Sequence, residues 1–103
     1  MKMSVLSALI TREEIRNRNM IAEYTRELDT LPKGSIKKKK VNGNIYYYLV
    51  FRNGNKIVSK YIGKDEESVT VIKGQILRRK QIEGILKKLA DERNQIEKLE
   101  ATL

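Results

Sequence analysis

The chain has 103 residues, of which 40% are hydrophobic and 34% charged, and its formal net charge is +9 at pH 7. This length fits one small domain with a modest core and leaves little room for a deep catalytic cavity as well. The absence of cysteine and histidine excludes disulfides, thiolate metal sites, and the most common general base and metal ligand. We therefore predict a protein that is not an enzyme and holds neither a cofactor nor a metal ion.

The positive charge is concentrated in one part of the chain. Between Thr30 and Lys64 there are nine lysine or arginine residues and no aspartate or glutamate. The remaining residues include 13 basic and 13 acidic side chains, so their formal charge is zero. No apolar run approaches the roughly 20 residues that span a bilayer. The first residues also lack the small-residue cleavage site of a secretion signal, so we expect a cytoplasmic protein.

The first segment, residues 1–31, is predicted to be helical. Thr11 followed three residues later by Glu14 has the spacing of a capping box, which predicts a helix that begins at Arg12. The residues before Thr11 form either a shorter helix or an exposed arm. An apolar stripe with helical spacing follows, and it consists of Ile21, Tyr24, Leu28 and Leu31. Pro32 and Gly34 then end the helix.

The second segment, residues 35–62, is predicted to be a three-stranded antiparallel β-meander. Three runs rich in β-branched and aromatic residues are separated by Asn-Gly-Asn at 42–44 and again at 53–55. Asn-Gly between such runs is a strong hairpin signal, because both residues tolerate the positive φ of tight hairpin turns. In the middle strand Tyr47, Leu49 and Phe51 face one side. Tyr46, Tyr48 and Val50 face the other.

The third segment, residues 65–103, is predicted to be one long helix. Asp65 can serve as its N-cap, since a carboxylate oxygen accepts hydrogen bonds from the free N–H groups of the first turn. An apolar stripe with heptad spacing follows, and Glu92 fills one of its positions. The stripe packs within the chain, forms a homodimer or binds another protein, and its residues are Ile82, Ile85, Leu89, Ile96 and Leu99.

Together these segments predict a single α+β domain over residues 1–103, with an N-terminal helix, the meander and a long C-terminal helix. Both faces of the middle strand are apolar or aromatic, so at least one face needs a helix on it. The sequence leaves open whether one face or both are covered.

An uncovered, basic sheet face can bind nucleic acid, because lysines neutralise phosphates and tyrosine rings stack on bases. In the competing interpretation the tyrosines form the core and cross-strand pairs, and the lysines prevent edge-to-edge aggregation. The candidate nucleic-acid-binding residues are Lys37, Lys38, Lys39, Lys40, Tyr46, Tyr48, Arg52, Lys56, Lys60 and Lys64.

Residues 31–64 resemble a module of small uncharacterised bacterial and mobile-element proteins. The resemblance lies in the Lys-Gly-Ser lead-in at 33–35, the Tyr-Tyr-Tyr-Leu strand at 46–49 and the Ser-Lys-Tyr-Ile-Gly ending at 59–63. The same stretch is more loosely similar to the three-stranded sheets with which integrative-element recombinases bind arm-type DNA sites. That similarity implies DNA contacts by Lys38, Lys40, Tyr46, Tyr48, Arg52, Lys56 and Lys60.

The leading functional hypothesis is a nucleic-acid-binding accessory or regulatory protein from a phage or mobile element, with DNA or RNA as its partner. The alternative is a small phage-encoded inhibitor of the anti-CRISPR type, which docks on a host defence nucleoprotein or on its guide RNA. A purely structural dimerisation module is a third interpretation. The first two differ in their prediction for free nucleic acid, which only the leading hypothesis expects to bind tightly and with strong salt dependence.

Overall fold

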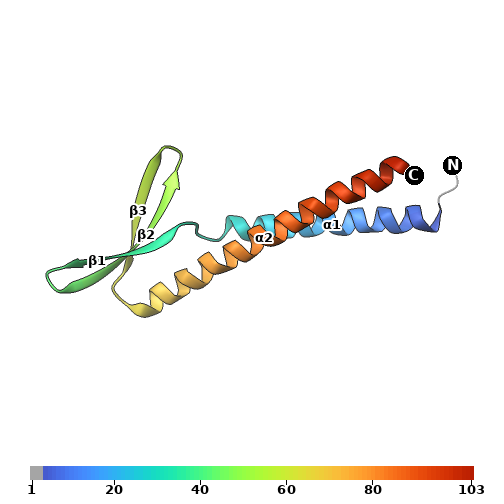
Figure 1. Ribbon diagram of the computed structural model, residues 1–103. Coiled ribbons are helices and arrows are strands. Elements are labelled where there is room, and N and C mark those ends of the chain that lie inside the picture. The colour runs from blue at the N-terminus through green and yellow to red at the C-terminus, as the bar shows by residue number, and fades with distance from the viewer. Residues whose placement is uncertain (1–3) are drawn as a thin grey trace. The chain divides into compact units, whose positions relative to one another are not determined.

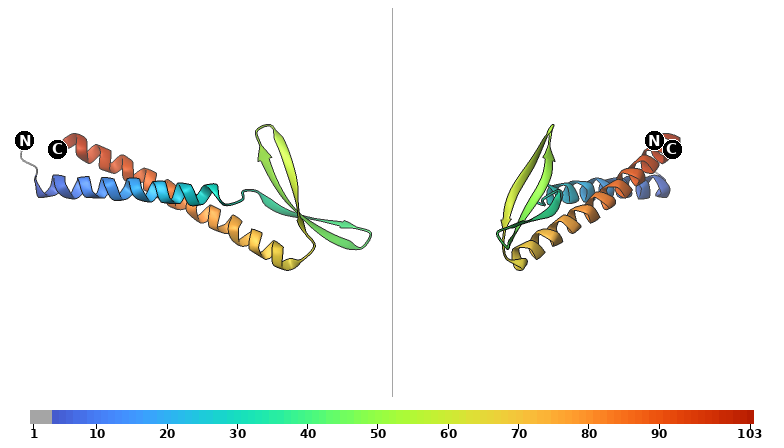
Figure 2. Two further views of the ribbon diagram at one scale, coloured as in Figure 1. Left: turned by 180° about the vertical axis from the view of Figure 1, so that it is seen from behind. Right: turned by 60° about the vertical axis from the view of Figure 1, so that its left-hand side comes forward.

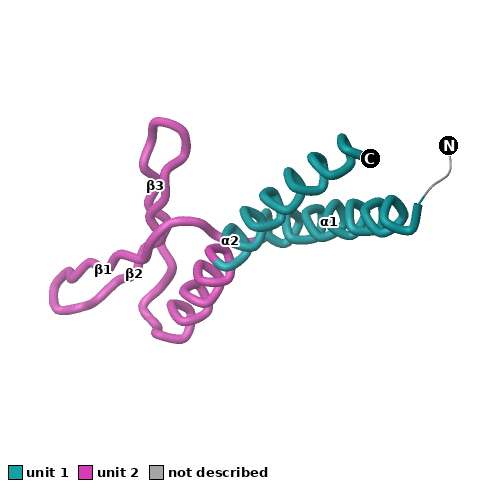
Figure 3. Tube along the Cα trace, turned by 45° about the vertical axis from the view of Figure 1, so that its right-hand side comes forward, with its two compact units in different colours: residues 1–30, 81–103 teal, residues 31–80 magenta. Residues whose placement is uncertain are grey.

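The computed structural model describes residues 4–103 and consists of two helices and one three-stranded sheet (Figure 1). In chain order the elements are α1 (Val5–Asp29), β1 (Ser35–Val41), β2 (Asn44–Asn53), β3 (Lys56–Gly63) and α2 (Glu66–Thr102). The predicted α+β architecture is confirmed. The chain divides into two compact units, one of residues 1–30 and 81–103 and the other of residues 31–80 (Figure 3). In the described part of the chain, neither helix is long and apolar enough to cross a bilayer.

Helix α1 begins earlier than the capping-box pattern predicted. The side chain of Ser4 accepts a hydrogen bond from the backbone N–H of Ser7 at 3.0 Å, so Ser4 is the N-cap and the helix starts at Val5. The predicted start at Arg12 is wrong, because a complete cap already exists about two turns upstream and no helix-breaking residue follows it. At the other end, the N–H of Thr30 donates to the carbonyls of Glu27 and Leu28 and closes the last turn.

The first unit is an antiparallel pair formed by α1 and the second half of α2. Its buried positions recur every seven residues, with Ile10 and Asn17 on α1 and Ile82, Leu89 and Ile96 on α2. This spacing is the heptad repeat of a coiled-coil seam. The seam contains one polar layer, since Asn17 is only 1% exposed and lies between the helices.

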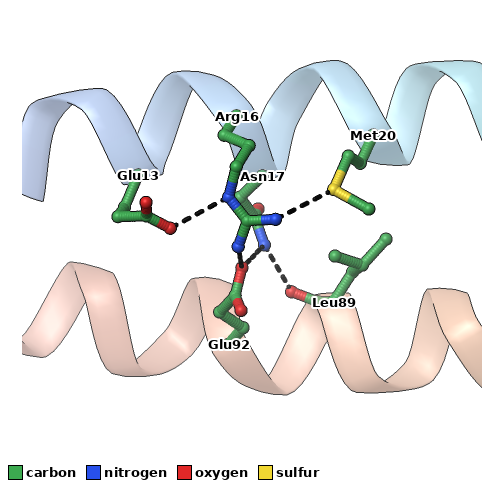
Figure 4. A network of polar contacts seen from close by, with 6 residues as sticks. All are labelled: Glu13, Arg16, Asn17, Met20, Leu89 and Glu92. Atoms are coloured by element: carbon green, nitrogen blue, oxygen red, sulfur yellow. Dashed lines mark hydrogen bonds and ion pairs between the residues drawn. The ribbon is translucent and has the colours of Figure 1, made fainter.

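The side-chain amide of Asn17 donates two hydrogen bonds to α2. One goes to the carbonyl of Leu89 at 2.9 Å and the other to Oε1 of Glu92 at 3.0 Å (Figure 4). Arg16 donates to the same carboxylate oxygen at 3.4 Å and to Glu13 at 3.0 Å. Because a single buried polar layer has few alternative partners, this network fixes the register in which the two helices pack.

The apolar stripe predicted on the C-terminal helix is partly used within the chain. Ile82, Leu89 and Ile96 are buried, Ile85 is half-buried, and Leu99 remains 52% exposed. Leu99 lines a shallow apolar groove of about 230 Å³ on this helix pair. The buried three are not accessible to another chain in this fold. A homodimer through the stripe stays a prediction, and it would have to use Leu99 and its exposed neighbours or displace α1.

The sheet in the second unit is the predicted meander, with strand order β1-β2-β3 and antiparallel pairing throughout. Its two Asn-Gly-Asn segments form different turns. In the first, Val41 pairs with Asn44, and both loop residues, Asn42 and Gly43, have positive φ, as a type I′ turn requires. In the second, Asn53 pairs with Lys56, so the loop is residues 54–55 and only its glycine has positive φ, as in a type II′ turn.

The two hairpins share only a short stretch of β2. Residues 44–50 pair with β1 and residues 47–53 pair with β3, so the sheet is three strands wide only at 47–50. Beyond this stretch the hairpins diverge, and their turns point in different directions (Figure 2). A bulge also interrupts β3, because Tyr47 lies opposite Gly63 while Tyr48 lies opposite Tyr61, which leaves Ile62 as an extra residue.

The second unit buries few apolar side chains. Leu49 of β2 and Val69 of α2 are its buried apolar residues among those the structure describes. Asp65 caps α2 as predicted, because its Oδ1 accepts a hydrogen bond from the N–H of Ser68 at 2.7 Å. The segment that leads into β1 is attached to α2 by a hydrogen bond of 2.8 Å, which a guanidinium nitrogen of Arg79 donates to the carbonyl of Leu31.

Candidate nucleic-acid interface

Three tyrosines gather on the sheet face opposite Leu49. Tyr46 and Tyr48 are two residues apart on β2 and therefore point to the same side. Tyr61 lies directly across from Tyr48 on β3, so its side chain joins them. The ring centroid of Tyr61 is 5.5 Å from that of Tyr48 and 6.3 Å from that of Tyr46, with the ring planes tilted by 57° and 51°. These are favourable distances and angles for aromatic pairs.

Two lysine ammonium groups lie above this tyrosine cluster. The Nζ of Lys39 is 5.4 Å from the ring centroid of Tyr48, and the Nζ of Lys64 is 5.0 Å from that of Tyr46. At these distances the quadrupole of each ring attracts the cation. The rings therefore hold two flexible lysine side chains on one side of the sheet, where both charges face solvent.

The β-bulge explains why Lys64 reaches this side. With regular pairing after Tyr61, Ile62 would lie opposite Tyr47 and Lys64 would continue on the face of Leu49. Because Ile62 is the extra residue, Gly63 takes the position opposite Tyr47 and the alternation of the following residue is reversed. Lys64 is consequently placed beside Tyr46.

A row of side chains crosses all three strands. Lys37 of β1 lies opposite Tyr48, and Tyr48 lies opposite Tyr61. Lys39 occupies the next position on the same side of β1, opposite Tyr46. Arg52 points to this side as well, farther along β2. We call this surface the tyrosine face, and it consists of Lys37, Lys39, Tyr46, Tyr48, Arg52, Tyr61 and Lys64.

The other predicted basic residues lie on the opposite face. Lys38 and Lys40 of β1 lie across from Tyr47 and Ile45, on the side of Leu49. Lys60 of β3 is directly opposite Leu49 and is exposed. Lys56 lies opposite Asn53 near the second turn and shares this side. The ten candidate residues therefore do not form one surface, because strand alternation divides them between two faces.

Tyr61 is a member of the tyrosine face that the sequence-based prediction did not include. The position of Tyr61 could have been predicted from the second Asn-Gly-Asn segment. A two-residue loop that pairs Asn53 with Lys56 places residue 61 opposite residue 48 by simple counting along the two strands. The hairpin register thus contained the position of the third tyrosine.

The tyrosine face combines ammonium and guanidinium cations with aromatic rings. Within the described residues, no cluster of three or more acidic side chains is arranged to hold a metal ion. Such a surface can neutralise phosphates through its ammonium groups and stack bases on its rings.

The model of the family described as "Domain of unknown function (DUF6788)" matches residues 10–71, which is more than half of the chain. The chain belongs to this family. The DUF6788 match includes most of α1, the whole sheet and the start of α2, so every residue of the tyrosine face lies inside it. Comparisons with curated proteins and with solved structures gave no match.

Proposed function

We propose that this DUF6788 protein is a non-enzymatic nucleic-acid-binding protein and that the tyrosine face is its binding surface. One observation carries the proposal. The ammonium groups of Lys39 and Lys64 are held over tyrosine rings on the same face as the exposed ring of Tyr61. Residues 30–64, which include both lysines, contain no acidic residue, and the first acidic side chains after them are those of Asp65, Glu66 and Glu67 at the start of α2.

Binding would follow from the two kinds of group on this face. Lysine ammonium groups displace condensed cations from the phosphates, and the release of these counterions drives association. Ring contacts restrict Lys39 and Lys64 before the ligand arrives, which reduces the side-chain entropy lost on binding. Lys37 adds a charge on β1 opposite Tyr48, and Arg52 extends the charge along β2 toward the second turn.

Within the same proposal, the protein acts in the cytoplasm as an accessory or regulatory factor of a phage or mobile element. The support for this setting is its small size and the resemblance of residues 31–64 to modules of such proteins.

A salt titration tests the proposal. Binding to fluorescent duplex DNA, single-stranded DNA and RNA is measured from about 50 mM salt upward, and the logarithm of affinity is plotted against that of salt concentration. The variant Lys39→Gln/Lys64→Gln removes two charges from the tyrosine face. The matched control Lys87→Gln/Lys88→Gln removes two charges from exposed positions of α2.

We expect binding in wild type and in the control, with a clearly weaker affinity in the tyrosine-face variant. On duplex DNA the salt slope should become shallower by about 0.9 for each phosphate that the variant no longer neutralises. Equal losses in both double variants would show that total charge, rather than this face, determines binding. No binding of any of the three ligands at low salt would refute the proposal and favour a protein or nucleoprotein partner.

A further inference from the structure

The three rings of the tyrosine face are not equivalent. The rings of Tyr46 and Tyr48 each have a lysine Nζ above them, at 5.0 Å and 5.4 Å from the centroid. In the described part of the chain, no lysine or arginine nitrogen occupies the corresponding position over Tyr61. Tyr61 is also the most accessible of the three, because it is 52% exposed whereas the other two are half-buried.

A solvent-exposed ring with an unoccupied face is a stacking partner for a planar group. The faces of bases in a duplex are already stacked on one another, so a protein side chain reaches only their edges in the grooves. The faces become accessible in a single strand, where aromatic side chains stack on them without strong sequence preference. Tyr61, the ring of this face over which no lysine ammonium group of the described residues lies, therefore favours unpaired bases as its ligand.

We infer that the tyrosine face binds single-stranded nucleic acid, with one base stacked on Tyr61 and the flanking phosphates at the ammonium groups of Lys39 and Lys64. This inference rests on the nucleic-acid binding proposed above. It adds the class of ligand and assigns separate tasks, since Tyr61 contacts a base while Tyr46 and Tyr48 position the two cations.

The arrangement of the cations fits this assignment. Tyr61 contacts both other rings, and each of those rings carries one ammonium group. The open ring thus has a cation near each of its two ring neighbours rather than a single cation on one side. A strand whose base stacks on Tyr61 can present the phosphates before and after that base to Lys39 and Lys64.

The test compares oligomers that differ only in their bases. Affinity is measured for a thymidine oligomer of about 10 nucleotides and for the same oligomer built from abasic residues. Both have the same phosphates, and a ribose version of the pair distinguishes RNA from DNA. The proteins are wild type, Tyr61→Leu, which keeps an apolar side chain, and Tyr61→Phe, which keeps the ring.

For wild type we expect the thymidine oligomer to bind between about 5-fold and 150-fold more tightly than the abasic oligomer, the range expected for one stacked base. Tyr61→Leu should bring this ratio close to one, whatever its effect on abasic binding, while Tyr61→Phe should retain it. Circular dichroism verifies that the variants are folded. The wild-type ratio tests the inference even if Tyr61→Leu does not fold.

Equal wild-type affinity for the two oligomers would overturn the inference and leave the proposed nucleic-acid binding intact. The inference would also be overturned, with the proposed nucleic-acid binding intact, if duplex DNA bound more tightly than the thymidine oligomer and Tyr61→Leu changed neither affinity. If none of the ligands bind, the proposed function itself fails, which the salt titration shows independently.

Discussion

The ring centroids of Tyr48 and Tyr61 lie 5.5 Å apart across β2 and β3, with their planes at 57°. They are a directly opposed cross-strand pair at the last regular position before the bulge. Tilted aromatic pairs of this kind stabilise a structure by about 0.5–1.5 kcal/mol beyond the area they bury. The pair therefore stabilises the pairing of β3 with β2 at the centre of the sheet. It also sets the position of Tyr61, the most exposed ring of the tyrosine face.

Gly34 is required for the entry into β1. Its φ is +125°, and a Cβ at this position would lie 2.3 Å from the carbonyl oxygen of Val50. We expect Gly34→Ala to lower the free energy of unfolding by at least about 2 kcal/mol, because the backbone conformation and the packing against β2 must both change. Urea denaturation followed by circular dichroism measures the effect.

Gly74 provides a control for which we expect the opposite change in the free energy of unfolding. It lies inside α2, and a Cβ added there would meet no neighbouring atom within 4 Å. Gly74→Ala should therefore stabilise the protein, by about 0.5–1 kcal/mol through helix propensity. A loss of stability in this variant as large as that of Gly34→Ala would refute the steric explanation for Gly34.

The polar layer at Asn17 is predicted to trade stability for a unique register. Replacing it together with its partner, in Asn17→Leu/Glu92→Leu, removes a buried amide and completes the apolar seam. We expect a higher midpoint of thermal unfolding and the appearance of dimers or larger species, because apolar seams accept several registers and partners. Analytical ultracentrifugation measures the association. A strictly monomeric, more stable variant would show that the layer does not specify the register.

Asp65 is expected to make the stability of α2 depend on acid pH. Hydrogen bonds from the side chain and backbone of Ser68 lower the pKa of Asp65 below its ordinary value of 3.8. Its stabilising contribution is therefore complete above that ordinary value and is lost as the pH falls through the lowered pKa. Asp65→Ala should lower the unfolding midpoint at pH 7, and the difference from wild type should shrink below about pH 4.

The neutral cap variant Asp65→Asn separates capping from charge. An asparagine oxygen still accepts the hydrogen bond from Ser68 but does not titrate in this range. The midpoint of Asp65→Asn should therefore stay above that of Asp65→Ala at every pH. If the two variants behave alike, Asp65 does not act as a cap.

Glu100 is expected to have the opposite pH dependence. A hydrogen bond with Glu14 raises the pKa of Glu100 above its ordinary value of 4.5, with desolvation and the charge of Glu14 acting in the same direction. This hydrogen bond stabilises the helix pair below the ordinary pKa and is lost as the pH rises through the raised one. Glu100→Gln, which donates at all pH values, should raise the unfolding midpoint at pH 7. The gain should disappear in acid, and a gain independent of pH would contradict the mechanism.

The sequence determines the meander and the long helix because their signals are local. Two Asn-Gly turns fix two hairpins, and Asp65 with the heptad stripe fixes the start and the buried side of α2. The predicted start of α1 was wrong because two caps compete within the same segment, and local spacing does not rank Ser4 against Thr11. Tertiary packing also decided that Asn17, a polar residue, would occupy a buried seam position.

The residue types of the candidate site could be predicted from the sequence, whereas their arrangement on the two faces of the sheet could be predicted only in part. Alternation along β1 already separates Lys37 and Lys39 from Lys38 and Lys40, and a two-residue second loop places Tyr61 across from Tyr48. The bulge at Ile62 has no such signal, since Ile62 is an ordinary strand residue. Long-range interactions such as the hydrogen bond from Arg79 to Leu31 depend on the folded unit and leave no local pattern.

The bulge in β3 determines which side of the sheet receives the last lysine. If Ile62 paired with Tyr47 in a regular ladder, Lys64 would lie on the face of Leu49, although the net charge of the chain would be unchanged. Deleting Ile62, by contrast, would leave Gly63 opposite Tyr47 and Lys64 beside Tyr46. The charge pattern of the tyrosine face therefore depends on Ile62 staying unpaired and not on its being present.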